Sequence, residues 1–173
     1  MKKLLSAAAA AAVLWGCQST PDDALRASAA LQSTKGNKTF GEATFEEAGD
    51  GKVRVIVFAQ GLKPGQEHGF HIHEAGDCSS GDGMSAKGHF NPLGKPHGNP
   101  SSAERHAGDL PSLKADKDGR GKLDVTVDGI TLRPGPSSII GRGVIIHADP
   151  DDYKTQPTGN AGARLACGVI RAG

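Results

Sequence analysis

The sequence predicts an all-β protein, an antiparallel sandwich or barrel, and two observations carry this prediction. Several short runs rich in β-branched residues are separated by turn signals. No stretch after the N-terminal apolar run has the 3.6-residue period of a long helix. The length of 173 residues suits one domain with a substantial core.

The strand signals follow one another along the chain. Residues 53–58 (VRVIVF) form a β-rich run, and residues 122–128 (KLDVTVD) alternate as a half-buried strand does. Residues 144–146 (VII) and 167–170 (CGVI) are short apolar runs that we also expect to be strands. Asp50-Gly51, just before the first run, supplies the tight bend of a hairpin.

Two segments do not fit strands. Residues 75–113 are rich in Gly, Pro, Ser and His, and residues 149–164 form a second polar stretch. Loops of this length are uncommon in a compact domain unless they are functional or disordered. The first contains several histidines and Asp109, so we expect bound metal to organise a loop that lacks the apolar content to fold by burial.

The N-terminal region predicts export. Residues 1–16 carry two lysines and then an apolar run, which is typical of a signal peptide. The sequence Leu14-Trp15-Gly16-Cys17 resembles a bacterial lipoprotein cleavage box, with Cys17 as the lipidated residue; an ordinary signal peptide with an incidental cysteine is the alternative. We therefore expect a polar tether at 17–27, a folded domain at 28–173, and a location in the periplasm or cell envelope, anchored to a membrane where Cys17 carries lipid.

The cysteine count agrees with this interpretation. The chain has three cysteines, and lipid on Cys17 leaves Cys78 and Cys167 to pair in an oxidising compartment. Two free thiols are the alternative. The charge of +1 and the absence of a basic run give no support for a nucleic-acid partner, and we expect none.

All seven histidines fall between His68 and His147. His71 and His73 are two residues apart, so on a strand their rings share one face, although such a pair alone is more often incidental than a ligand pair. Three imidazoles and one carboxylate make a closed zinc set, whereas a site of nitrogen ligands with one open face suits copper. The residues considered for these sites are His71, His73, His89, His97, His106, Asp109 and His147.

Several spaced motifs, in order, resemble the copper–zinc superoxide dismutase family. They are Gly69-Phe70-His71-Ile72-His73, Gly88-His89-Phe90-Asn91-Pro92, His97-Gly98, Arg105-His106-Ala107-Gly108-Asp109-Leu110 and the segment 159–168 (GNAGARLACG). The resemblance runs from about residue 27 to residue 171. It implies a Greek-key antiparallel β-barrel or sandwich with long metal-binding and electrostatic loops, and it identifies residues 28–173 as a domain of this kind.

The resemblance also implies the cofactors and their ligands. One copper and one zinc per subunit are expected. Copper is expected on His71, His73, His89 and His147, and zinc on His89, His97, His106 and Asp109. His89 then bridges the two metals, and the resemblance implies a Cys78–Cys167 disulfide. The expected activity is dismutation of the superoxide anion to dioxygen and hydrogen peroxide.

The remaining roles follow in the same way. Arg164 is expected to attract superoxide and, with His89, to take part in catalysis. Asp151 is expected to link one copper and one zinc histidine, with Asp149 and Asp152 as neighbouring alternatives. His68 is expected to be structural. The main alternative function is a non-catalytic copper- and zinc-binding module of the cell envelope. A homodimer is considered as the assembly, although the sequence does not indicate which barrel face is apolar and exposed.

Overall fold

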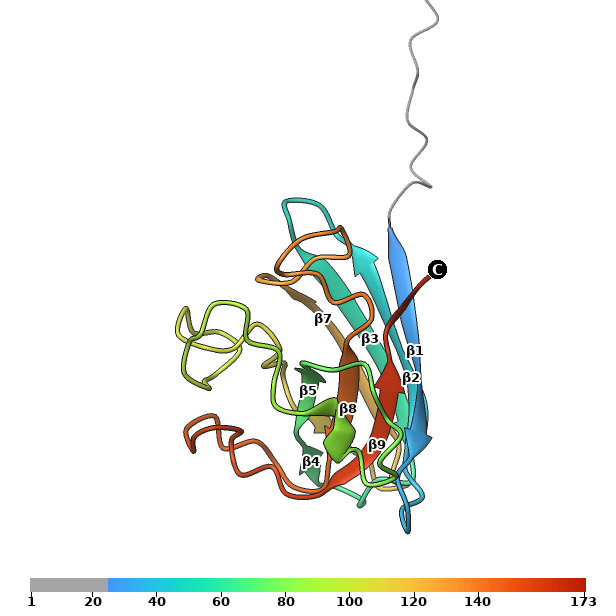
Figure 1. The fold of residues 1–173 in the computed structure, drawn as a ribbon. Helices are drawn as coiled ribbons and strands as arrows, with labels where there is room; N and C mark the ends of the chain where they lie inside the picture. The colour runs from blue at the N-terminus through green and yellow to red at the C-terminus, as the bar shows by residue number, and fades with distance from the viewer. Residues whose placement is uncertain (1–24) are drawn as a thin grey trace, which may run out of the picture.

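The computed structural model describes residues 25–173 and is built almost entirely from antiparallel strands (Figure 1). In chain order the strands are β1 (Arg26–Ser33), β2 (Phe40–Glu47), β3 (Val53–Gln60), β4 (Glu67–His68), β5 (Phe70–His73), β6 (Leu113–Lys114), β7 (Gly121–Val127), β8 (Gly143–His147), β9 (Arg164–Val169) and β10 (Arg171–Ala172). A single 3₁₀ turn, η1 (Met84–Ala86), completes the regular structure of residues 25–173. The all-β prediction is confirmed.

The main sheet has the strand order β5-β8-β9-β1-β2-β3-β7, with β10 paired to β1, and it curls into a half-barrel (Figure 1). Strands β1, β2 and β3 are joined by short hairpins, and β9 returns from the far end of the chain to lie beside β1. Three consecutive strands with a later strand beside the first form a Greek key. Strands β4 and β6 make a separate two-stranded pair.

The core follows from residue alternation along the strands. In β3, Val53, Val55 and Val57 are buried while the residues between them face outward, as the period of two requires. Strand β7 contains the alternating run at 122–128 except its last residue, β8 contains the run at 144–146, and β9 contains the run at 167–170 except Ile170.

The predicted hairpin turn is also present. The amide of Ala48 donates to the Lys52 carbonyl at 3.0 Å, and the amide of Lys52 donates to the Gly49 carbonyl at 2.9 Å. Asp50 and Gly51 both have positive φ, which explains why Asp-Gly stands at this bend.

Strand β1 begins inside the segment expected to be a tether. The tether was expected to reach residue 27, but Arg26 and Ala27 already pair with Glu46 and Phe45 of β2. Two of the three buried residues of β1 are alanines that alternate with polar residues, so the start of the strand gives little strand signal. The predicted signal peptide, Cys17 and most of the tether lie outside the described residues. Within residues 25–173, no helix has the length and apolar character to cross a membrane.

The two long loops are where the sequence places them. After β5, the chain forms only η1 and isolated bridges until β6 at Leu113. Cys78 of this loop is bonded to Cys167 of β9, with a Cα–Cα distance of 5.9 Å, so the predicted disulfide is confirmed. The second loop runs from the end of β8 to the start of β9 at Arg164.

Candidate metal centre

Two groups of buried side chains meet over β5 and β8. The all-histidine cluster comprises His71, His73, His89 and His147, and the carboxylate cluster comprises His89, His97, His106 and Asp109. Within each cluster the potential ligand atoms lie within 4.8 Å of one another. His89 belongs to both clusters. The structure therefore brings together all seven side chains that the sequence singled out.

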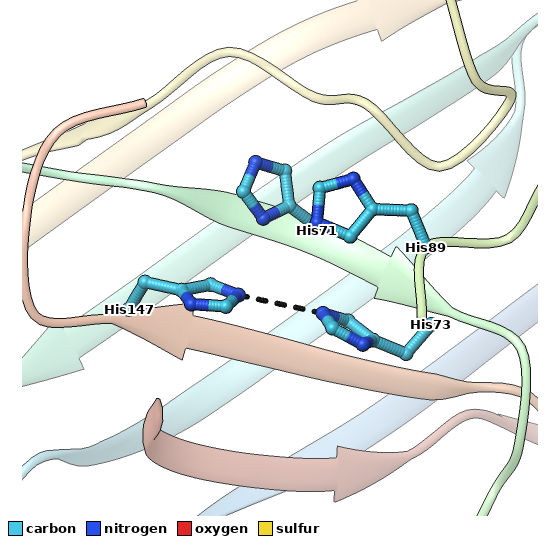
Figure 2. Close-up of side chains that lie close together, drawn as sticks. All are labelled: His71, His73, His89 and His147. Carbon is cyan, nitrogen blue, oxygen red and sulfur yellow. Dashed lines mark hydrogen bonds between the residues drawn. The ribbon is translucent and has the colours of Figure 1, made fainter. Parts of the chain in front are cut away.

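Strands position three rings of the all-histidine cluster. His71 and His73 stand on β5, and His147 ends β8 where the pairing with β9 shifts register. A β-bulge of this kind re-aims a side chain. Figure 2 shows the four rings directed at one another, with His73 Nε2 3.4 Å from His147 Nε2. The rings of His71 and His89 are close, with centroids 4.0 Å apart.

The outward nitrogen of each strand-borne ring is held by an oxygen. His71 Nε2 is 2.7 Å from Asp151 Oδ2, His73 Nδ1 is 2.9 Å from the Lys87 carbonyl, and His147 Nδ1 is 3.3 Å from the Gly162 carbonyl. Contacts of this type fix the orientation of a metal-binding imidazole. The opposite nitrogens are left facing the centre of the cluster.

Two nitrogens that face the all-histidine cluster have no hydrogen-bond partner although they are buried. They are Nδ1 of His71 and Nε2 of His89. A buried polar atom without a partner is rare and calls for an explanation such as a metal ion. Four converging imidazole nitrogens with no carboxylate among them fit copper.

The carboxylate cluster has the dimensions of a zinc site. Asp109 Oδ1 lies 2.8 Å from His89 Nδ1, 3.0 Å from His97 Nδ1 and 3.3 Å from His106 Nδ1. Tetrahedral zinc with bonds of about 2.0–2.1 Å requires ligand atoms roughly 3.3 Å apart. Three nitrogens and one oxygen around a common point fit zinc.

One loop supplies the carboxylate cluster, and backbone contacts pin this loop to β5. Ile72 accepts the amide of Phe90 at 2.8 Å and donates its own amide to the Gly108 carbonyl at 3.0 Å. Isolated bridges pair His71 with Asp109 and His73 with His89. A Cβ at position 108 would collide with the Ile72 carbonyl, so only glycine allows this approach.

Burial keeps the all-histidine cluster neutral. Desolvation lowers the pKa of His71 and takes the pKa values of His73 and His147 well below the ordinary value of 6.5. Desolvation also lowers the pKa of His89 to about 4, against the opposing effect of Asp109. Neutral imidazole is the form that binds metal.

In the carboxylate cluster, hydrogen bonds rather than burial set the direction of the pKa shifts. Burial alone would lower the pKa of His97, but hydrogen bonds to Asp109 and Asp151 outweigh it and raise this pKa to about 9. Burial would raise the pKa values of the two carboxyls, but hydrogen bonds from the surrounding histidines and backbone amides hold both below the ordinary value of 3.8. Without metal, His97 therefore carries a proton between two carboxylates at neutral pH.

Asp151 connects the two clusters. Its Oδ2 contacts His71 Nε2 at 2.7 Å, its Oδ1 contacts His97 Nε2 at 2.9 Å, and Oδ1 also accepts the Tyr153 amide at 2.7 Å. Of the three aspartates considered from the sequence, Asp151 makes these contacts; Asp149 is exposed, and Asp152 binds residues of its own loop.

Arg164 stands beside the all-histidine cluster. Its Nη1 donates to the Gly83 carbonyl and its Nη2 to the Lys87 carbonyl, each at 2.6 Å. The side chain is half-buried, and this burial lowers its pKa. His68 is buried too, but it contacts the His147 carbonyl at 2.8 Å and belongs to neither cluster.

Some residues of the centre were missed from the sequence. The carbonyls of Lys87 and Gly162 orient His73 and His147, and Gly159 leaves room for the contact between Asp151 and His97. Backbone carbonyls leave no residue-type signal, so no residue type in the sequence identifies them. The dense glycines around these positions are the one available hint.

Comparisons with known proteins agree with this geometry. The family model described as "Copper/zinc superoxide dismutase (SODC)" matches residues 39–170. The chain is 42% identical over 175 residues to "Superoxide dismutase [Cu-Zn] 2" of Aquifex aeolicus (strain VF5), covering 99% of this chain and all of the relative. It is 47% identical over 148 residues to "Superoxide dismutase [Cu-Zn] 2" of Brassica juncea, covering 82% and 94% of the two chains.

A solved structure is also similar. The crystal structure of the clock protein EA4 superposes with a TM-score of 0.78 at 42% identity, and the match covers 89% of this chain and 98% of that one.

Proposed function

The chain belongs to the copper/zinc superoxide dismutase family, and from that premise we propose how its residues carry out dismutation. The reaction converts two superoxide anions and two protons to dioxygen and hydrogen peroxide. The enzyme uses one copper and one zinc per subunit. The observation that carries this function is the pair of buried ligand clusters that share His89. A non-catalytic metal-binding module is not favoured.

The ligand sets follow from the two clusters. His71, His73, His89 and His147 would hold copper, and His89, His97, His106 and Asp109 would hold zinc. Bound copper supplies a centre that changes oxidation state, and bound zinc supplies fixed positive charge without redox chemistry. The unpartnered buried nitrogens of His71 and His89 support these sets.

His89 is suited to moving a proton. Its two ring nitrogens face the two clusters, and Nε2 has no hydrogen-bond partner within the described residues. With Nδ1 directed at Asp109 and Nε2 at the all-histidine cluster, the ring would hold a proton at Nε2 and give it to a departing anion. The ring therefore serves both as a ligand and as a proton donor to the product.

Arg164 attracts the substrate. Two backbone carbonyls fix its guanidinium beside the all-histidine cluster, so its charge does not need to be reorganised when the anion arrives. A local positive potential steers small anions even though the whole chain carries a charge of only +1.

The test combines two measurements on one purified sample, metal content and the rate of superoxide decay. We expect about one copper and one zinc per chain, with fast decay that stops when copper is removed. Arg164→Gln should keep both metals and lose roughly tenfold or more in rate at low salt. Both metals bound without decay above that of free copper would contradict the proposed function.

We also propose that the enzyme acts in the periplasm or cell envelope, with residues 1–16 as signal peptide and lipid on Cys17. The lysines and apolar run at the N-terminus and a disulfide between Cys78 and Cys167 support export. Mass spectrometry of the mature N-terminus tests lipidation, and Cys17→Ala should release the protein from the membrane fraction. An unmodified Cys17 in the mature protein would exclude the anchor.

A homodimer is the assembly we propose. Phe40 of β2 and Phe58 of β3 are 51% and 55% exposed and lie diagonally across two paired strands. Glu42 and Lys122 flank Phe58, so a second copy turned by 180° can pair these opposite charges. Sedimentation velocity should give a dimer that Phe58→Ser converts to monomer; a monomeric wild-type protein at high concentration would exclude it.

A further inference from the structure

Lys87 has a backbone conformation that side chains rarely adopt. Its φ is 63° and its ψ is −147°, a region essentially restricted to glycine because a Cβ is crowded there. It follows η1 and stands two residues before His89, at the edge of the all-histidine cluster. Strain of this kind persists only where the surroundings enforce it, and it concentrates at functional sites.

The Lys87 carbonyl explains the conformation. This one oxygen contacts His73 Nδ1 at 2.9 Å and accepts Arg164 Nη2 at 2.6 Å. It therefore orients a ring of the all-histidine cluster and the guanidinium that attracts the substrate. Glycine would present the same carbonyl without strain. The lysine side chain needs a separate reason.

The side chain has no structural role that would supply this reason. It is 64% exposed, and its Nζ lies 3.8 Å from Oε1 of Glu74, which is 55% exposed. An exposed pair at this distance contributes little to stability. The Arg164 guanidinium is nevertheless bonded to the backbone of Lys87 itself, so the ammonium stands on the residue that holds this arginine.

We propose that Lys87 is a second anion-guiding residue of the copper site, acting with Arg164 on the incoming anion, and that Glu74 limits its effect. This inference rests on the proposed function. Two positive groups on residues that contact each other raise the local concentration of a small anion, and the benefit disappears as salt screens them. Lys87 does not touch the reacting atoms; it guides their approach.

The test uses three variants of the full metal-loaded protein. At low ionic strength, Lys87→Gln should lower kcat/KM about twofold or more and flatten its salt dependence, while Lys87→Arg retains both. Glu74→Gln should raise kcat/KM and steepen the salt dependence. A loss in Lys87→Gln that persists at high salt would show a structural effect and overturn the inference.

A second readout does not depend on turnover. Azide is a small monovalent anion whose binding to copper is followed by absorption. Its dissociation constant at low salt should rise about twofold or more in Lys87→Gln and stay near the wild-type value in Lys87→Arg. An unchanged constant in Lys87→Gln would overturn the inference even if the wild-type protein is active. A wild-type protein that binds azide but does not turn over superoxide would overturn the proposed function instead.

Lys87→Gly separates charge from backbone strain. Glycine removes the charge and relaxes the φ of 63°, so the metal-free variant should unfold at a higher temperature than both wild type and Lys87→Gln. Its kcat/KM should match that of Lys87→Gln. Wild-type kcat/KM in Lys87→Gly would show that the ammonium guides nothing.

Discussion

The two clusters share His89 but are built on different parts of the molecule. His71, His73 and His147 of the all-histidine cluster stand on β5 and β8, whose side chains are fully buried. His97, His106 and Asp109 of the carboxylate cluster all stand on the loop between β5 and β6. The sheet therefore preforms one half of the centre by hydrophobic burial, whereas the other half depends on what the loop binds.

The two halves also differ in the protonation of their histidines when no metal is bound. The all-histidine cluster is neutral without metal, because burial lowers the pKa of every ring in it. The carboxylate cluster holds a protonated His97 between two carboxylates. Metal entering the first half meets free nitrogens, whereas metal entering the second must displace a proton. The loop half should consequently show the stronger coupling between metal, proton and folding.

The largest effect is expected from Asp109→Ala. This change removes the one carboxylate of the carboxylate cluster and also the acceptor for the amides of Gly98 and His106. The variant should lose zinc and most of the roughly 10 kcal/mol that a structural zinc contributes in small domains. Zinc titration and thermal unfolding measure both losses. Asp152→Ala is the matched control, because that carboxylate is exposed and binds only its own loop; equal losses in both variants would remove the distinction between the halves.

Loss of the disulfide is expected to come next. Cys78–Cys167 closes a separation of 89 residues and ties the long loop to β9. In the chain-entropy account, the Cys78→Ser/Cys167→Ser variant loses about 4–5 kcal/mol of unfolding free energy. Chemical denaturation measures the loss. Zinc binding should suffer more than copper binding, since the bond restrains the loop; the reverse order would contradict this account.

The unfolding stability of the metal-free protein should depend on pH in opposite ways for the two halves. The rings with lowered pKa contribute stability that is full above pH 6.5 and is lost as pH falls toward 4. His97, with a pKa raised to about 9, contributes stability that is full below pH 6.5 and is lost as pH rises to 9.

The stability contributed by the all-histidine rings is lost in acid, and the stability contributed by His97 is lost in alkali. The melting temperature should therefore peak near neutral pH. It should fall by roughly 5 °C or more by pH 4.5 and by less on the alkaline side. Scanning calorimetry across this range is the measurement. A protein whose stability still rises between pH 7 and 9 would rule out the protonated His97.

The smallest effect is expected from Asp151→Asn. An amide offers one oxygen, so it can accept from His71 or from His97 but not from both. Loss of a carboxylate behind a metal-binding histidine typically weakens metal affinity about 10- to 100-fold. Competition with a chelator should show weaker binding of both metals. Weakening of one metal alone would mean that Asp151 does not couple the clusters.

More of the strand-borne half than of the loop-borne half could be predicted from the sequence. The spacing of His71 and His73 places both rings on one face, and strand alternation identifies the buried face. The loop residues lack any periodicity, so residue type indicated metal binding there, and the assignment of each residue to zinc or copper came from the family resemblance. Strands β1 and β2 gave weak signals because Ala, Ser, Thr and Glu dominate them. Nothing in residue type distinguished Asp151 from Asp149 and Asp152, because the choice depends on where the second loop folds back.

Residue-resolved hydrogen exchange of the metal-free protein, with and without added zinc, tests the comparison most directly. Amides of β5 and β8 should be protected in both states, because the sheet alone holds them. Amides between residues 97 and 109 should exchange rapidly without zinc and become protected when zinc binds. Equal protection of the loop in both states, or loss of protection in β5 and β8 without zinc, would contradict a centre whose two halves are organised by different forces.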